Sequence, residues 1–332
     1  MRLLNIQNLR TTFDIHVGSI QAVRGVDLYV DEGETIGIVG ESGSGKSVSM
    51  LSLMRLLPNY ARIESDSITF MGQELKNASV RQLRKLSGNQ IGMVFQDPLT
   101  CLNPLFSIGH QLMEPLKIHK KMNKTEAYAR SVEMLKTVDM PDPESRMKQY
   151  PHELSGGMRQ RVMIAIAVVS DPRLVIADEP TTALDVTIQA QILALLQTLQ
   201  SRHNMATIMI THDLGVIAGM CSRVMVMYGG CIVEEGVTRE VFYTPRHPYT
   251  WGLLRSIPQK AGVKQKLIPI PGSPPDLIAP PPGCPFEPRC PHAMIICRTQ
   301  MPAHRPLSDT HKVRCYLLDE GAPKVQWGGV TH

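Results

Sequence analysis

Apolar positions follow two patterns along the first 255 residues. Continuous apolar runs at Thr35–Val39, at 174–177 and at 208–210 predict buried strands. Apolar residues at helical spacing predict helices, and these segments are 48–54, 113–121, 124–138, 162–169 and 187–201. Because the predicted strands alternate with predicted helices, the pattern indicates an α/β fold with a parallel sheet.

The pattern changes after about Arg255. More than half of the 25 prolines lie between Pro245 and Pro306. Proline fixes φ and lacks an N–H donor, so we expect little regular helix or sheet there. At 332 residues and 43% apolar composition, the chain can bury one large core and carry an appendage.

Composition also indicates whether a membrane or a nucleic acid is an expected partner. No uninterrupted run of about 18 apolar residues occurs, so no membrane span is expected. The net charge is only +5, and no basic run is interleaved with aromatic residues. Nucleic acid is therefore not an expected partner. Attachment to a membrane would have to come through protein partners.

A glycine-rich segment between the strand Thr35–Val39 and the helix 48–54 matches the pattern G-x-x-x-x-G-K-[S/T]. Its residues are Gly40, Glu41, Ser42, Gly43, Ser44, Gly45, Lys46 and Ser47. Strand, glycine loop and helix in this order are typical of a loop that binds nucleotide phosphates. The glycines let backbone N–H groups turn toward the phosphates, Lys46 would reach the β- and γ-phosphates, and Ser47 would ligate Mg²⁺. The alternative is a Gly/Ser-rich turn that happens to carry a lysine.

Two carboxylates follow the predicted strand at 174–177. Ligands bind outside the carboxyl ends of parallel strands, where Asp178 and Glu179 would lie. Asp178 would hold Mg²⁺ through water, and Glu179 would polarise the attacking water. The alternative, two solvated acids before Pro180, is much weaker in a chain that already carries a phosphate loop.

A second glycine-containing loop lies far downstream. Its residues are Leu154, Ser155, Gly156, Gly157 and Met158. With this loop the chain resembles the nucleotide-binding subunits of ATP-binding-cassette (ABC) transporters, whose signature is LSGGQ; methionine replaces the final glutamine here. Ser155 suits a helix N-cap, and the helix after it would present its N-terminal end to an anion.

Further positions match the same family in the same order. Gln96 resembles the Q-loop glutamine, Ala183-Leu184-Asp185 the D-loop, and His212 the switch histidine. Phe13 is the candidate for the aromatic residue that stacks on adenine. The resemblance implies that Gln96, Glu179 and His212 are catalytic, that Gln96 also contacts Mg²⁺, and that Asp185 belongs to the D-loop.

The resemblance implies an ABC-type P-loop ATPase with a RecA-like core, an antiparallel β subdomain and a helical signature subdomain. The nucleotide-binding domain would span 1–255, with the helical subdomain at about 97–160, and a Pro/Cys-rich extension would span 256–332. Two ATP molecules would be sandwiched between this cassette and a partner cassette. The signature loop would contact the γ-phosphate of the ATP that the partner's phosphate loop holds. Residues 101–105, after the Q-loop, would relay closure to the membrane subunits.

Four of the seven cysteines cluster in the proline-rich tail. They are Cys284, Cys290, Cys297 and Cys315, whereas Cys101, Cys221 and Cys231 are interpreted as small core residues. Disulfides are disfavoured for a cytosolic chain. Thiolate ligation suits Zn²⁺ or an iron–sulfur cluster, and the spacings are wider than those of typical zinc sites. Such loops fit the bulk of a cluster more easily.

Residues 247–254 and 282–291 closely resemble the C-terminal extension of oligopeptide/dipeptide ABC importers. The resemblance implies a [4Fe-4S] cluster in the tail, with Zn²⁺ or no metal as alternatives. It also implies a second, different ATPase subunit, two permeases and an extracytoplasmic solute-binding protein, at the cytoplasmic face of the membrane. A homodimer is the alternative to the expected heterodimer. Peptide is the favoured cargo, over nickel or oligosaccharides.

Two other classes of function compete with transport. Soluble ABC ATPases of translation or DNA repair usually carry two cassettes or a long coiled-coil insertion, and neither occurs here. A regulatory or metal-sensing module would have lost hydrolysis. Glu179 and His212 argue against that module, because the catalytic set is complete.

Overall fold

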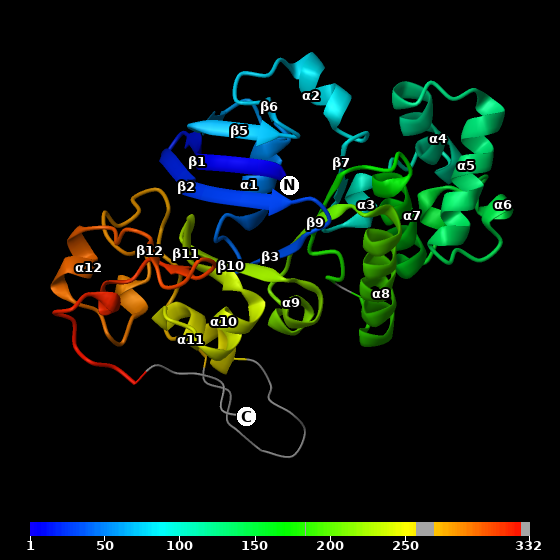
Figure 1. Ribbon diagram of the computed structural model, residues 1–332. Coiled ribbons are helices and arrows are strands. Elements are labelled where there is room, and N and C mark those ends of the chain that lie inside the picture. The colour runs from blue at the N-terminus through cyan, green and yellow to red at the C-terminus, as the bar shows by residue number, and fades with distance from the viewer. Residues whose placement is uncertain (183, 257–268, 327–332) are drawn as a thin grey trace. The chain divides into compact units, whose positions relative to one another are not determined.

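The computed structural model describes residues 1–182, 184–256 and 269–326. The chain divides into two compact units that alternate along the sequence. The first unit, called the helical unit, consists of Met1 and residues 30–34 and 77–209. The second, called the phosphate-loop unit, consists of residues 2–29, 35–76 and 210–332. Both contain strands and helices (Figure 1).

The phosphate-loop unit contains an antiparallel sheet in the order β2-β1-β5-β6, with β4 also pairing with β1. Its strands are β1 (Arg2–Ile15), β2 (Gly18–Asp31), β4 (Ala61–Glu64), β5 (Ser67–Phe70) and β6 (Gln73–Glu74). The pairs Leu4–Phe70 and Ile6–Ile68 are in register and fully buried. One face of this sheet is therefore apolar core, as expected of an antiparallel sheet.

A second group of strands in this unit has the order β12-β13-β11-β10-β3. They are β3 (Thr35–Val39), β10 (Arg223–Tyr228), β11 (Cys231–Val237), β12 (Arg305–Pro306) and β13 (Lys312–Val313). β3 and β10 run parallel, whereas β10 and β11 form an antiparallel pair. The apolar run at Thr35–Val39 is thus a buried strand, as the pattern predicts.

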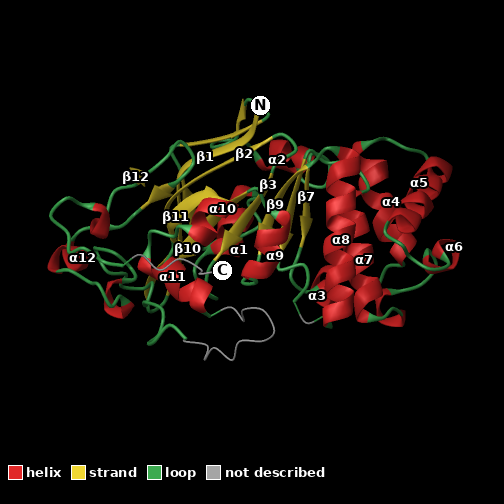
Figure 2. Ribbon diagram, turned by 60° about the horizontal axis from the view of Figure 1, so that its bottom comes forward, coloured by secondary structure: helices red, strands yellow, loops and turns green. Residues whose placement is uncertain are grey.

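The helices of this unit are short. They are α1 (Lys46–Leu53), α9 (Leu214–Met220), α10 (Thr238–Tyr243), α11 (Pro248–Arg255) and α12 (Ile295–Thr299), with 3₁₀ turns η2 (Glu287–Arg289) and η3 (Tyr316–Leu318). The described tail, 269–326, is mostly loop (Figure 2), which agrees with its proline content. It is not wholly irregular, because β13 pairs with β11 and α12 forms after Met294.

The helical unit has the strand order β9-β8-β7, and β7 and β8 run parallel. The strands are β7 (Ile91–Val94), β8 (Leu174–Asp178) and β9 (Ala206–Ile210). The helices are α2 (Val80–Leu86), α3 (Pro98–Cys101), α4 (Ile108–His119), α5 (Lys124–Thr137), α6 (Pro143–Arg146), α7 (Gly156–Val168) and α8 (Val186–His203), with the turn η1 (Pro151–Glu153). α4, α5 and α7 pack against one another, and α8 lies beside α7 (Figures 1 and 2).

Side-chain caps explain where several helices begin. Asn123 and Glu126 form a capping box at α5, so the predicted helix at 124–138 is confirmed. The helix predicted at 113–121 in fact begins at Ile108, because the Ser107 hydroxyl accepts a hydrogen bond from the His110 N–H. The predicted helix at 187–201 is confirmed as α8.

The expected positions of the scattered cysteines are only partly right. Cys221 and Cys231 are buried, as expected of small core residues. Cys101 is exposed, so the prediction for it is wrong. It ends the four-residue helix α3, none of whose side chains is buried.

Candidate functional site

The residues of the predicted ATP site divide between the two units. Gly40–Ser47, Phe13 and His212 belong to the phosphate-loop unit, and Gln96, Asp178 and Glu179 to the helical unit.

The phosphate loop connects β3 to α1. Gly45 caps α1 with φ 100°, in the left-handed region, which favours glycine. A Cβ atom on Gly45 would overlap the carbonyl oxygen of Ala22, and one on Gly40 would overlap that of Met227. The loop conformation therefore needs glycine at both positions for steric reasons as well as conformational ones.

Lys46 is buried, and its ammonium group is held by the loop itself. Its Nζ donates to the carbonyl oxygens of Gly40, at 2.8 Å, and Glu41, at 3.0 Å. The lysine thus closes the loop into a ring whose charge lies at the start of α1. A helix N-terminus with an ammonium group beside it is suited to binding an anion.

Glu41 makes contacts that the motif does not predict. Its carboxylate forms an ion pair with Arg289, with Nη1 2.6 Å from Oε2 and Nη2 3.0 Å from Oε1. Its N–H donates to the hydroxyl of Tyr249 on α11, at 2.8 Å. The motif does not identify Arg289 and Tyr249 as residues of this site, because they lie more than 200 residues away along the chain.

His212 is exposed and directly precedes Asp213, the N-cap residue of α9. Asp213 caps that helix through hydrogen bonds to the N–H groups of Gly215 and Val216. The Thr211 N–H donates to the Ile38 carbonyl at the end of β3, the strand that leads into the phosphate loop. His212 therefore stands on a capped, anchored turn of the same unit as the phosphate loop.

Phe13 lies on β1 and is half-buried. Its ring is 6.0 Å from that of Tyr60, with a tilt of 56° between the two planes. Tyr60 is more than half exposed. Phe13 is thus part of an accessible aromatic pair, which suits base stacking as well as packing.

The carboxylates of the helical unit lie at the end of β8. Asp178 is buried, and Glu179 follows with φ 46°, an uncommon conformation for a residue with a side chain. Gln96 Nε2 donates to Glu179 Oε2 at 2.9 Å, and the Thr182 hydroxyl donates to the same oxygen. The structure brings together Gln96 and Glu179, which lie 83 residues apart and are predicted to act together.

The signature loop begins α7. The Ser155 hydroxyl accepts a hydrogen bond from the Met158 N–H, so Ser155 is the helix N-cap that the sequence predicts. Leu154 is buried, whereas Ser155 and Gly156 are exposed. Among the described residues, no atom lies within 4 Å of the position that a Cβ atom on Gly156 would take, so none of them covers that side of the helix N-terminus.

The D-loop prediction is partly within the described residues. Asp185 caps α8 by accepting hydrogen bonds from the N–H groups of Thr187 and Ile188. Ala183, which precedes it in the predicted D-loop, lies outside the described residues.

The four tail cysteines line one pocket. Cys284, Cys290, Cys297 and Cys315 all contribute to it, together with His247 and His292. Its volume is only about 10 Å³, room for about one water-sized sphere. Burial raises the pKa of the Cys284 and Cys315 thiols to about 12 and that of Cys290 to about 11. Over the described part of the chain, no three such side chains are arranged as a ready metal-ligand set.

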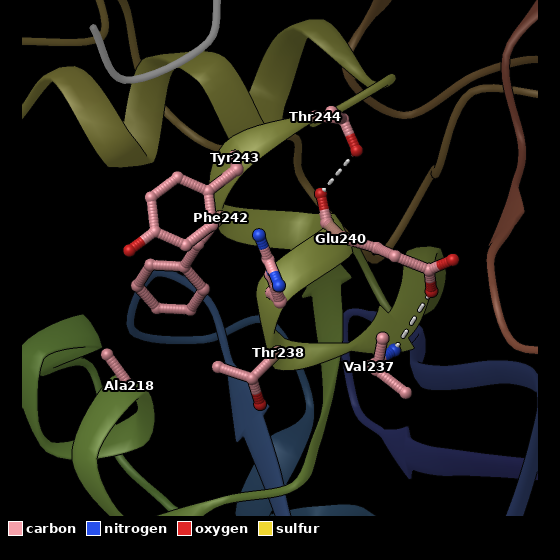
Figure 3. Close-up of a pocket in the computed structure, with 8 residues that line it drawn as sticks. Ala218, Val237, Thr238, Glu240, Phe242, Tyr243 and Thr244 are labelled. Atoms are coloured by element: carbon pink, nitrogen blue, oxygen red, sulfur yellow. Dashed lines mark hydrogen bonds between the residues drawn. The ribbon is translucent and has the colours of Figure 1, made fainter. Parts of the chain in front are cut away.

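A larger groove of about 840 Å³ lies along α10 and is shown in Figure 3. Phe242 and Tyr243 line it from α10, and Ala218 lines it from α9. Its one carboxylate, on Glu240, accepts hydrogen bonds from the Ser308 and Thr310 hydroxyls and the Val237 N–H. The groove contains none of the predicted site residues.

No helix in the described residues is long and apolar enough to span a membrane.

Two protein families match the chain. A model described as "ABC transporter" matches residues 23–182, and one described as "Oligopeptide/dipeptide transporter, C-terminal region" matches residues 233–297. The first match contains the phosphate loop, the signature loop and both carboxylates. The second contains three of the four tail cysteines.

Similar proteins extend the match over almost the whole chain. The dipeptide transport ATP-binding protein DppD of Bacillus subtilis (strain 168) is 50% identical over 329 residues, which cover 99% of this chain and 98% of the relative. The oligopeptide transport ATP-binding protein OppD of Escherichia coli (strain K12) is 54% identical over 300 residues, covering 90% and 89%.

Solved structures support the fold. A dimeric bacterial ABC transporter cassette matches with a TM-score of 0.64 and 28% identity, covering 71% of this chain and 99% of that cassette. Fold, motifs and relatives therefore agree. The chain belongs to the ABC transporter family and is one of its ATP-hydrolysing subunits.

Proposed function

We propose that this chain is the ATP-hydrolysing subunit that powers uptake of di- or oligopeptides through a multi-subunit ABC importer. The observation that carries the proposal is the 50% identity to a dipeptide transport ATP-binding protein along both the cassette and the tail. The match of 233–297 to the oligopeptide/dipeptide transporter C-terminal region supports the same cargo class. Nickel and oligosaccharides are the alternative cargoes.

ATP phosphates would bind at the phosphate loop, against its backbone N–H groups, Lys46 and the N-terminus of α1. Phe13 would stack on the adenine. Glu179 would accept the proton of the attacking water, and Gln96 holds that carboxylate in place. His212 would contact the γ-phosphate.

The hydroxyl of Ser47, the carboxylate of Asp178 and the amide of Gln96 are oxygen donors, the kind that Mg²⁺ prefers. These residues would hold the ion. When bound, Mg²⁺ neutralises the charge that develops on the transferred phosphoryl group.

The signature loop would complete the ATP site of a partner cassette. Ser155, Gly156 and Gly157 begin α7, whose exposed N-terminal end suits a γ-phosphate held by another chain. Binding of ATP would close the pair and hydrolysis would reopen it. The partner would be a second, different ATPase subunit, with a homodimer as the alternative.

Two permease subunits and an extracytoplasmic solute-binding protein would complete the importer. The chain would sit at the cytoplasmic face of the membrane, held there by the permeases. Residues 1–255 would form the nucleotide-binding domain, with its helical subdomain at about 97–160, and 256–332 the extension. The family matches at 23–182 and 233–297 support two regions, although the second begins before residue 256.

Purification of this chain from gently solubilised native membranes tests the assembly. We expect mass spectrometry to find two permeases, a second ATPase and a solute-binding protein that carries peptides. Ribosomal or DNA-repair companions without a permease would contradict transport and favour a soluble ABC ATPase.

The tail would carry a metal centre held by Cys284, Cys290, Cys297 and Cys315. The chemistry of these residues fits such a group, because four thiols line one small pocket and thiolates bind iron–sulfur clusters and zinc. A four-iron cluster is larger than this pocket, so the thiols would have to open around it. A structural [4Fe-4S] cluster is the favoured identity and Zn²⁺ the alternative.

The Cys290→Ser variant is expected to lose the iron, the acid-labile sulfide and the visible absorbance of the anaerobically purified chain, because one of four thiolate ligands is removed. Metal analysis and an absorption spectrum measure this. Cys101→Ser, at the exposed cysteine, is the matched control and should keep the full content. Unchanged iron and sulfide in Cys290→Ser would contradict the cluster, and zinc in the wild type would select the alternative.

A further inference from the structure

Arg289 uses every hydrogen-bond donor that its side chain has. Its guanidinium carries five N–H groups. Two donate to the carboxylate of Glu41, one to the Tyr228 hydroxyl, and two to the carbonyl oxygens of Ile270 and Pro271. The side chain is only 5% exposed. A buried guanidinium with all five donors engaged is held in a single orientation.

Glu41, in turn, is held on three sides. Arg289 binds its carboxylate, Tyr249 accepts from its N–H, and Lys46 donates to its carbonyl. The Arg289 and Tyr249 contacts come from residues after 245, and the third comes from the lysine that would contact the phosphates. The conformation of the phosphate loop therefore depends on the C-terminal region of the chain.

The segment that carries Arg289 is itself well anchored. Arg289 ends the turn η2, and the fully buried Phe286 precedes that turn. The Phe286 ring packs against those of Tyr228 and Tyr249, at 5.3 Å in each case. Cys290, which lines the cysteine pocket, follows Arg289 directly. The arginine thus joins a packed aromatic cluster to the phosphate loop.

A carboxylate in a loop that binds phosphates is unfavourable unless its charge is neutralised, because like charges repel. The bidentate ion pair with Arg289 neutralises the charge of the Glu41 carboxylate and restricts the rotation of its side chain. A loop that is already ordered also loses less conformational entropy when a ligand binds. Both effects would favour ATP.

We infer that Arg289 is a positioning residue of the ATP site: it neutralises Glu41 and holds the phosphate loop in the shape that receives the nucleotide. The C-terminal region then contributes to ATP binding through Arg289. This inference rests on the proposed function only in taking ATP as the ligand of the loop.

The test is the Kd for MgATP of the full chain, measured by isothermal titration calorimetry. Arg289→Gln is expected to weaken ATP binding about tenfold, the size expected for loss of charge-assisted hydrogen bonds. The double variant Arg289→Gln/Glu41→Gln should recover most of the lost affinity, because the unpaired carboxylate is gone. A purely structural role of Arg289 would not produce this rescue.

Steady-state kinetics supply a second readout. Because Arg289 acts on binding, its glutamine variant should raise the KM for ATP while kcat changes little. Arg298→Gln is the matched control: it removes the ion pair of an exposed arginine of the same tail with Glu287 and should leave Kd and KM unchanged. Arg289→Lys keeps the charge but not the five-donor fork and should bind with intermediate affinity.

Wild-type affinity in Arg289→Gln, or a double variant that binds no better than Arg289→Gln, would overturn the inference. If Arg289→Gln does not fold, Arg289→Lys decides: wild-type affinity would refute the role of the fork, and weakened binding would support it. A wild-type chain that binds no ATP would instead overturn the proposed function, so the two failures are distinguishable.

Discussion

The Glu179→Gln variant is expected to bind ATP and to hydrolyse it at least about 100-fold more slowly than the wild type, the usual scale of general-base catalysis. Glutamine has nearly the shape of glutamate but cannot accept a proton from water. Its amide can still meet Gln96 and Thr182, which contact the Glu179 carboxylate here. Steady-state phosphate release and the Kd for MgATP, measured on the same preparation, separate catalysis from binding.

Glu133→Gln is the matched control for this variant. Glu133 lies in the same unit on α5, is 65% exposed and pairs with Arg130 at the surface. Its replacement should leave the rate unchanged, since exposed ion pairs contribute little. Equal rates in Glu179→Gln and the wild type would refute Glu179 as the residue that activates water.

Local sequence determines the parts of the site that the motifs predict. The phosphate loop follows from glycines that no other residue can replace at Gly40 and Gly45, and the N-cap of α7 follows from Ser155 alone. Each depends on contacts within a short segment or on backbone conformations that favour one residue type. Such features can be recognised from a single sequence.

The contacts of Glu41 could not be predicted in this way. Arg289 lies 248 residues further along the chain, in a proline-rich segment whose pattern predicts only loops. Nothing in the spacing of that segment shows which of its arginines is buried. Tertiary packing around Phe286 decides this: Arg289 is 5% exposed, whereas Arg298 is 77% exposed.

Contacts in the folded chain also explain why the predictions for the start of α4 and for the burial of Cys101 are wrong. α4 begins five residues before its predicted start, because Ser107 caps it there and the buried Ile108 and Leu112 extend its apolar face toward that cap. Cysteine is usually buried, so the sequence predicts Cys101 in the core. It is exposed here because it ends α3, a helix that buries none of its side chains.

Removal of the Lys46 ammonium is expected to affect ATP binding more than any other single change in the chain. In Lys46→Ala we expect the Kd for MgATP to rise by at least about 30-fold, since loss of one partner of a buried charged contact costs roughly 2–5 kcal/mol. Calorimetric titration with MgATP measures the change, and ATPase activity should fall with it.

Two effects act together in that loss. The phosphates lose a cationic partner, and the carbonyl groups of Gly40 and Glu41 lose the donor that closes the loop. Lys76→Ala is the control, because Lys76 belongs to the same unit and its ammonium donates to the exposed carbonyl of Asp66. Near wild-type affinity in Lys46→Ala would mean that backbone N–H groups and the helix N-terminus alone hold the phosphates, and that Lys46 is a structural residue of the loop.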